Sequence, residues 1–164
     1  MIFRRVESDD DREVLLEVTL EAAEMRFLRK VPKKLKDIFL HPDRSPAVID
    51  RLFPPTYDDP ETEKEHRRLL GETLLERRKE GLECFSQILD RADGGRLTAS
   101  VAEINLLLQV LNDYRLMLGV EMNLTDNDWS SDARVFFRHP RKFAEMAFAS
   151  ALQEEIIRGC SEDT

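Results

Sequence analysis

The apolar residues of this chain recur with the spacing of α-helices, and they predict four main helices. These helices are expected to span residues 9–30, 60–92, 99–119 and 140–158. The first depends on apolar residues that share one helical face, Leu15, Val18, Ala22 and Met25. Pro32 is expected to end it, because proline lacks a backbone N–H and its ring clashes with the preceding helical turn.

The third predicted helix is apolar around most of its circumference. Ser100 and Glu103 form a capping box at its start. Its polar residues draw only a narrow stripe, Asn105, Gln109, Asn112 and Asp113. A helix with so little polar surface belongs at the centre of a bundle. The pattern therefore predicts an all-α fold, with about four main helices around a central apolar helix.

The segments between the helices carry turn signals. Six of the seven prolines lie between residues 32 and 60, where short helical turns are expected at 35–40 and 46–52. Asp59-Pro60 begins the second long helix as an N-cap followed by proline, and Asp93-Gly94-Gly95 ends it. Residues 2–6 and Arg96-Leu97 could be extended, so one tiny two-stranded pairing is left open.

Size and charge bound the class of protein. A chain of 164 residues is a normal length for one domain, and we expect residues 1–164 to form a single helical domain. The stretch richest in apolar residues, 104–111, is far short of the ~20 residues that span a bilayer. Two cysteines and no apolar signal core indicate a cytoplasmic protein. The net charge of −8 argues against nucleic acid as the general partner.

A basic run stands out against that negative charge. Between residues 26 and 36 there are six basic residues and no acidic one: Arg26, Arg29, Lys30, Lys33, Lys34 and Lys36. This basic patch could dock an acidic partner or a phosphate backbone. It could equally be a solvated segment whose charges complement a helix dipole.

Three polar residues lie in or beside the central helix, Asn112, Asp113 and Arg115. Buried polar groups need partners, so Asp113 is expected to pair with an arginine of another helix, Arg67 or Arg68. The alternative is a small-molecule or peptide site lined by Asn112, Asp113, Arg115 and Arg67.

Catalytic and metal-binding motifs in this sequence are incomplete or absent. Glu63 and His66 have the Glu-x-x-His spacing of di-iron bundles, but those sites need the motif twice. Alternating polar residues between Asp126 and Asp132 begin like a calcium loop, yet the glycine and glutamate of that loop are missing. Nucleotide-binding and hydrolase motifs are absent. We therefore expect no catalytic residue, no metal and no cofactor.

Two blocks of the chain resemble a known family. The first runs from Leu52 to Pro60 (LFPPTYDDP) and leads into residues 65–69 (EHRRL). The second runs from Leu111 to Gly119 (LNDYRLMLG) and is followed by Leu124-Thr125. Together they resemble the bacterial domain-of-unknown-function family numbered twenty-seventeen, over about residues 2–157. The resemblance implies an intracellular bacterial protein. Some family members are encoded beside an adaptor of the Clp protease, and some have been called regulators.

These observations favour a non-enzymatic interaction or regulatory module. Its partner is expected to be a protein, and a homodimer is left open. Two other functions compete with this one. The first is an enzyme or ligand-binding protein with a site near Asp113, and the second is a nucleic-acid-binding regulator that uses the basic patch.

Overall fold

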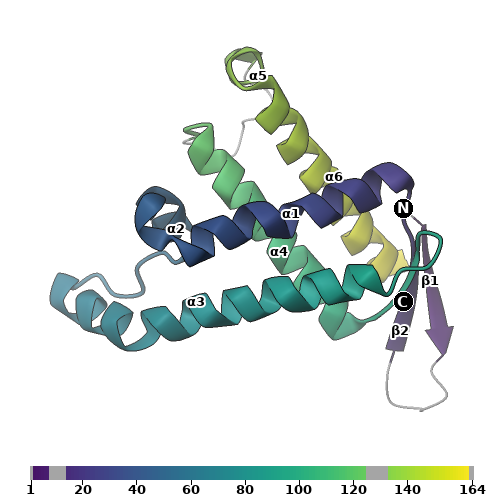
Figure 1. Ribbon diagram of the computed structural model, residues 1–164, viewed down its shortest axis with the longest axis horizontal. Helices are drawn as coiled ribbons and strands as arrows, with labels where there is room; N and C mark the ends of the chain where they lie inside the picture. Colours follow the sequence, from purple (N-terminus) through teal and green to yellow (C-terminus); the bar gives the residue numbers. More distant parts are fainter. Residues whose placement is uncertain (1, 8–13, 125–132, 163–164) are drawn as a thin grey trace.

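The computed structural model describes residues 2–7, 14–124 and 133–162, and its fold is mostly helical, as predicted (Figure 1). Its elements are β1 (Ile2–Glu7), β2 (Val14–Thr19), α1 (Ala22–Leu40), η1 (Pro42–Arg44), α2 (Pro46–Leu52), α3 (Pro60–Asp90), β3 (Arg96–Ser100), α4 (Val101–Glu121), α5 (Ala133–Arg138) and α6 (Pro140–Glu162). Within these ranges no helix is long and apolar enough to cross a membrane.

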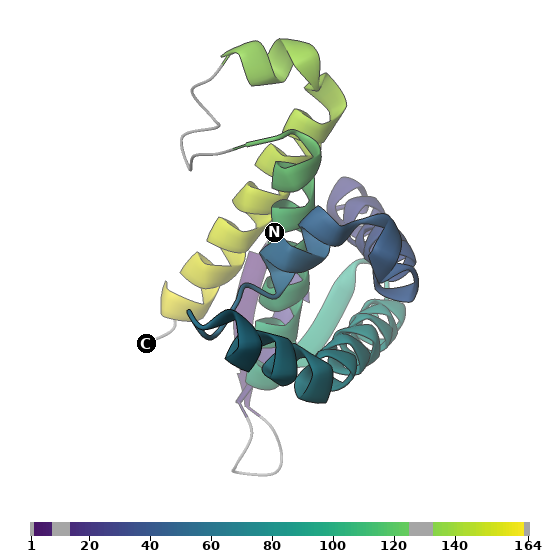
Figure 2. The same cartoon turned by 90° about the vertical axis from the view of Figure 1, so that its left-hand side faces the viewer.

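Helix α4 occupies the centre, which confirms the prediction for the apolar segment. It contacts α1, α2, α3 and α6, and in Figure 2 it lies between α6 on one side and α1 and α3 on the other. Asn105, Gln109 and Asn112 of the predicted polar stripe are exposed, and the buried residues lie on the other side of the helix: Ile104, Leu107, Val110, Leu111, Asp113, Tyr114, Met117 and Leu118. The capping box at its start is present, since the Ser100 N–H donates to Glu103 at 2.9 Å and the Glu103 N–H donates to Ser100 Oγ at 3.3 Å.

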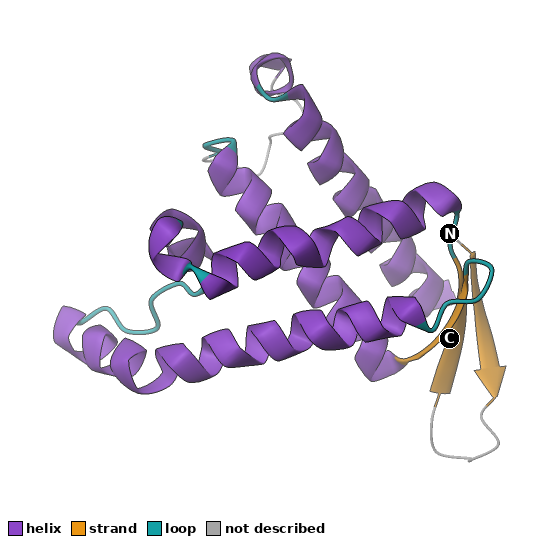
Figure 3. Cartoon of the chain, in the orientation of Figure 1, coloured by secondary structure: helices purple, strands orange, loops and turns teal. Residues whose placement is uncertain are grey.

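The three strands form a small antiparallel sheet at one end of the molecule, in the order β1-β2-β3 (Figure 3). The predicted helix over 9–30 is therefore wrong over residues 14–19, because Val14–Thr19 is a strand, whereas residues 9–13 lie outside the described residues. Leu16, Val18 and Leu20 are buried while the residues between them are partly exposed, which is the two-residue alternation of a strand. That alternation coexists with the helical spacing, and pairing with β1 and β3 decides between them.

Arg96 and Leu97 are extended, as expected, but β3 pairs with β2 and not with the N-terminal strand. Leu97 lies opposite Val18, and Ala99 lies opposite Leu16. All four of these side chains are buried, so this pairing places one face of the sheet against the hydrophobic core.

Pro32 does not end the first helix, contrary to the prediction. It lies inside α1, which continues to Leu40 and so includes the helical turn expected at 35–40. Helix interiors with proline lose about 3 kcal/mol. The apolar face of α1 outweighs that cost, because Leu28, Val31, Leu35 and Phe39 are all buried in the core.

Helix α3 extends beyond the hydrophobic core that it helps to cover. All of its buried residues lie in the second half: Leu82, Phe85, Ile88 and Leu89. The first half extends past α2 and forms one end of the molecule (Figure 1). Asp59 caps it by accepting the Thr62 N–H at 2.9 Å, as the Asp-Pro signal predicted. Short helix α2 also forms where it was expected, and it packs on α4.

A two-glycine turn connects α3 to β3. Gly94 and Gly95 both have positive φ, of 56° and 85°. The Gly95 carbonyl accepts the Leu20 N–H at 2.7 Å, so the turn also ties β3 to the start of α1. A Cβ added at Gly95 would lie 2.5 Å from the Leu20 carbonyl oxygen, which is a backbone clash.

We expect Gly95→Ala to destabilise the protein by at least about 2 kcal/mol, because it combines backbone strain with that clash. Gly94→Ala is the matched control, since a Cβ at Gly94 meets nothing within 4 Å. It should cost only about 1 kcal/mol for the left-handed conformation. Urea unfolding of both variants measures the difference, and equal losses would contradict the role of the Leu20 contact.

Candidate functional site

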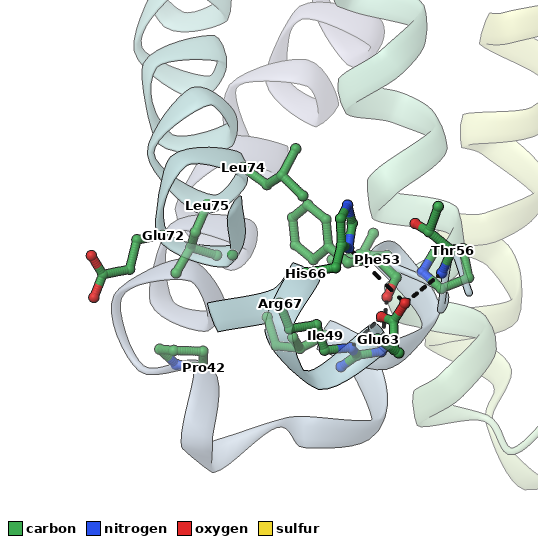
Figure 4. A pocket seen from close by; sticks show the side chains of 13 residues that line it. Pro42, Ile49, Phe53, Thr56, Glu63, His66, Arg67, Glu72, Leu74 and Leu75 are labelled. Carbon is green, nitrogen blue, oxygen red and sulfur yellow. Dashed lines mark hydrogen bonds and ion pairs between the residues drawn. The ribbon is translucent and has the colours of Figure 1, made fainter. Parts of the chain in front are cut away.

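A groove opens between α2, the segment that follows it, and the first half of α3 (Figure 4). It has a volume of about 500 Å³. Its walls are mostly apolar and include Pro42, Ile49, Leu52, Phe53, Leu74 and Leu75. We call this feature the α2–α3 groove. Its size and lining are those of a ligand or peptide site.

Two charged residues of α3 hold one wall of the groove in place. Glu63 accepts the backbone N–H groups of Thr56 and Tyr57, at 2.8 and 3.1 Å. Arg67 donates to Glu63 at 2.8 Å and to Asp50 of α2 at 2.8 Å. The hydrogen bond from Arg67 is the main reason that the pKa of Glu63 is lowered. This clamp fixes the α2–α3 connection against α3, and it occupies the charges of both residues.

His66 lies in the same wall, edge-on to the ring of Tyr57 with 5.2 Å between ring centroids. Its Nδ1 is 4.0 Å from Glu63 Oε2. The Glu-x-x-His spacing thus brings the two side chains near each other, but the carboxylate already accepts hydrogen bonds from Arg67, Thr56 and Tyr57. The described residues hold no group of three or more His, Cys, Asp or Glu side chains able to bind a metal. The calcium-like run at 126–132 lies outside the described residues.

Asp113 is linked to the groove through Arg78 and Phe53. Its carboxylate pairs with Arg78 of α3 at 3.0 Å, and its side chain is only 3% exposed. The Arg78 guanidinium in turn lies over the ring of Phe53, 5.7 Å from the centroid. Burial raises the pKa of Asp113 to about 6, although Arg78 acts in the other direction. A chain of contacts therefore runs from the central helix through Arg78 to the groove.

The predicted site residues do not converge on one point. Arg67 lines the groove, whereas Asp113 lies behind its wall and Asn112 is exposed. Arg115 faces α6, where it donates to Gln153 at 2.7 Å.

The expected partner of Asp113 was wrong: it is Arg78, and not Arg67 or Arg68. Arg68 pairs with Glu65 on its own helix. Arg67 is eleven residues from Arg78, which is about 16 Å along a helix, so it is too far away to replace it.

Arg78 was missed by the sequence analysis, although a signal for it exists. It falls in the apolar stripe Leu75, Arg78, Leu82 and Phe85, where each residue follows the last by three or four positions. An arginine inside such a stripe indicates a buried carboxylate partner. Asp113 is likewise a charged residue among the apolar residues of α4. Each of the two residues therefore indicates that the other is its partner.

The predicted basic patch divides into two groups. Lys30 and Lys34 bind Glu145 of α6, the second at 2.8 Å, and Tyr114 donates to the same carboxylate at 2.6 Å. Burial alone would raise the pKa of Glu145, but these three donors outweigh it and lower the pKa to about 2.

The remaining members of the patch, Arg26, Arg29, Lys33 and Lys36, are exposed. Arg29 makes a loose ion pair of 3.9 Å with Asp90. Only this second group is therefore open to a partner.

The comparisons with known proteins give one match. The family model described as "Domain of unknown function (DUF2017)" matches residues 3–159. This covers nearly the whole chain, so the chain belongs to this family, and the resemblance noted in the sequence is confirmed. No curated protein and no solved structure matches.

The buried pair gives a stability prediction. Arg78→Ala should cost about 3–5 kcal/mol, because it leaves the Asp113 charge buried without a partner. The double variant Arg78→Met/Asp113→Leu should recover most of that loss. Arg77→Ala, at an exposed neighbouring position, is the control and should stay within about 0.5 kcal/mol of the parent. Chemical denaturation compares them, and a mild effect of Arg78→Ala would refute the pairing.

The Glu145 cluster gives a pH prediction. The pKa of Glu145 is lower in the folded protein than in the unfolded chain, so its contribution is present above pH 4.5 and disappears as the pH falls towards 2. Glu145→Gln should therefore lose on the order of 2 kcal/mol at pH 7, and little at pH 2.5. Unfolding curves between these values test this, with exposed Glu154→Gln as the control. A loss that does not change with pH would argue against the cluster.

Proposed function

We propose that this DUF2017 protein is a non-enzymatic interaction or regulatory module of the bacterial cytoplasm. In this proposal residues 1–164 act as a single helical domain, and the α2–α3 groove binds an apolar segment of a partner protein. The observation that carries the proposal is a groove of about 500 Å³ with mostly apolar walls and a clamp whose charges are already paired with each other.

The apolar walls supply the driving force for such binding. Burial of one large apolar side chain contributes roughly 1.5–3 kcal/mol, so one or two anchors would give a useful affinity. The same half of α3 also exposes two large apolar side chains that do not line the groove, Leu69 at 59% and Leu70 at 45%. Exposed apolar surface of this kind is typical of protein interaction sites.

The fixed geometry of the clamp favours recognition over chemistry. Glu63 and Arg67 bind each other, Arg67 also binds Asp50, and Glu63 also accepts a backbone N–H of the α2–α3 connection. The wall of the groove is therefore formed before binding, and a ligand need not order it. A preformed apolar groove loses less entropy on binding than a flexible loop does.

The two alternative functions have weaker support. An enzyme site near Asp113 would draw on the raised pKa of that residue, but its carboxylate is buried against Arg78 behind Phe53. A nucleic-acid regulator would draw on the basic patch, yet Lys30 and Lys34 are bound to Glu145 and the chain carries a net charge of −8.

Gly71 provides a clean way to test the groove. It lines the groove, and a Cβ built there meets nothing within 4 Å. Gly71→Trp should therefore fill the groove while leaving the helix intact. Gly119→Trp is the matched control, since Gly119 lies in α4, has similar free space and does not line this groove.

We expect a displayed random-peptide library to yield peptides with large apolar residues, which bind the parent and Gly119→Trp but lose at least tenfold in affinity for Gly71→Trp. Changes in the NMR chemical shifts of backbone amides on peptide addition should map the contacts to α2 and to residues 63–75. Peptides that bind both tryptophan variants equally, or a library without enrichment, would refute the proposal.

A further inference from the structure

We propose that the partner segment is acidic on one side of its apolar anchor, and that its acidic residues bind a second groove lined by lysines. This inference rests on the proposed function, because it names the chemistry of the segment that the α2–α3 groove would hold. It commits to one occupant, an acidic and amphipathic segment of another protein.

The second groove lies between α1 and the second half of α3 and has a volume of about 610 Å³. Its rim carries Lys33 and Lys36 of α1 and Lys79 of α3, against one acid, Glu83. Its apolar part comes from Pro32, Leu40 and Leu82, and Leu40 is 51% exposed. We call it the lysine groove. Three lysines around an apolar surface suit a segment that alternates apolar and acidic residues.

The lysines of this region differ in whether they already form ion pairs within the protein. Lys33 and Lys36 have no ion-pair partner among residues 2–7, 14–124 and 133–162, whereas Lys30 and Lys34 of the same helix are bound to Glu145. Lys79 makes one pair along its own helix with Glu76, and the Glu76 side chain is 62% exposed. An exposed pair of this kind is weak, so an incoming carboxylate could replace it. The lysine groove thus offers charge that the fold itself does not use.

The two grooves are consecutive along the molecule. Leu75 lines the α2–α3 groove, and Lys79, one helical turn later in α3, lines the lysine groove. The other wall agrees, because Pro42 lines the first groove and Leu40 lines the second. From Gly71 to Glu83 the distance along the helix is about 18 Å. An extended peptide covers this distance in about five or six residues.

The charges of the two grooves also determine where the acidic residues of the bound segment can lie relative to its apolar anchor. Glu72 lines the α2–α3 groove on the side away from Glu63 and Arg67 (Figure 4). An acidic residue next to the apolar anchor would meet this carboxylate, while one five or six positions away would meet the three lysines. Glu72 in the α2–α3 groove and the three lysines in the lysine groove therefore favour one placement of the acidic residues along the two grooves and disfavour the reverse.

The test extends the peptide selection to charge. Against the parent protein, a random 16-residue library should yield a large apolar residue and two or three Asp or Glu residues, separated by about five or six positions if the peptide is extended. The variant Lys33→Glu/Lys36→Glu/Lys79→Glu should lose at least tenfold in affinity for these peptides. The control Arg51→Glu/Lys64→Glu/Arg158→Glu makes the same change in net charge at exposed positions outside both grooves and should keep the parent affinity.

Two further measurements keep the test decisive. Glu83→Lys adds a fourth lysine to the groove and should tighten binding at least threefold at low salt, and salt should weaken it. If the triple glutamate variant does not fold, the neutral variant Lys33→Gln/Lys36→Gln/Lys79→Gln replaces it, with circular dichroism as the check.

The outcomes separate this inference from the proposed function. Apolar peptides that depend on Gly71 but carry no acids, or that bind the lysine variants as well as the parent, would overturn the acidic partner and leave the groove as a binding site. Peptides rich in Lys or Arg would also overturn it. A library without any peptide sensitive to Gly71→Trp would overturn both proposals.

Discussion

The fold depends on one constraint: helix α4 is apolar around most of its circumference, and this apolar surface has to be covered. Helices α1, α2, α3 and α6 and strands β2 and β3 contribute to this cover. Burial of this much apolar surface is the main favourable contribution to folding. The buried charge of Asp113 follows from the same constraint, because a carboxylate in such a helix must find its partner on one of the covering elements. Arg78 supplies it, and so fixes how α3 sits on α4.

The grooves are consequences of this cover. Helices α1 and α3 pack side by side over α4, and the lysine groove lies where these two helices meet. Helix α3 continues beyond the part that α4 requires, and α2 with its following loop closes against that extension to form the α2–α3 groove. The same ion pair that satisfies the core also holds Phe53 in the groove wall, so the stability of the centre and the shape of the surface are linked.

Local signals predicted much of this fold. The Asp-Pro start of α3, the Gly-Gly turn and the capping box of α4 act within a few residues, and each of them was confirmed. The strand at 14–19 was missed, because its apolar residues fit both periodicities and only long-range pairing with β1 and β3 decides between them. The partner of Asp113 was missed for a similar reason, since several arginines of α3 are equivalent in sequence until the helices are packed. Of the candidate sites, Arg67, Lys33 and Lys36 line grooves, but the grooves themselves arise from packing that no local pattern encodes.

The first half of α3 has a consequence of its own. These turns have one partly covered face and, at Leu69 and Leu70, a side that meets water. Their hydrogen bonds are therefore held by a local free energy smaller than that of the core, and they open without global unfolding. An occupant of the neighbouring groove would add the missing second support and make these turns part of the cooperative unit. Association would then raise the free energy of local opening in these turns, since only the closed helix presents the preformed groove.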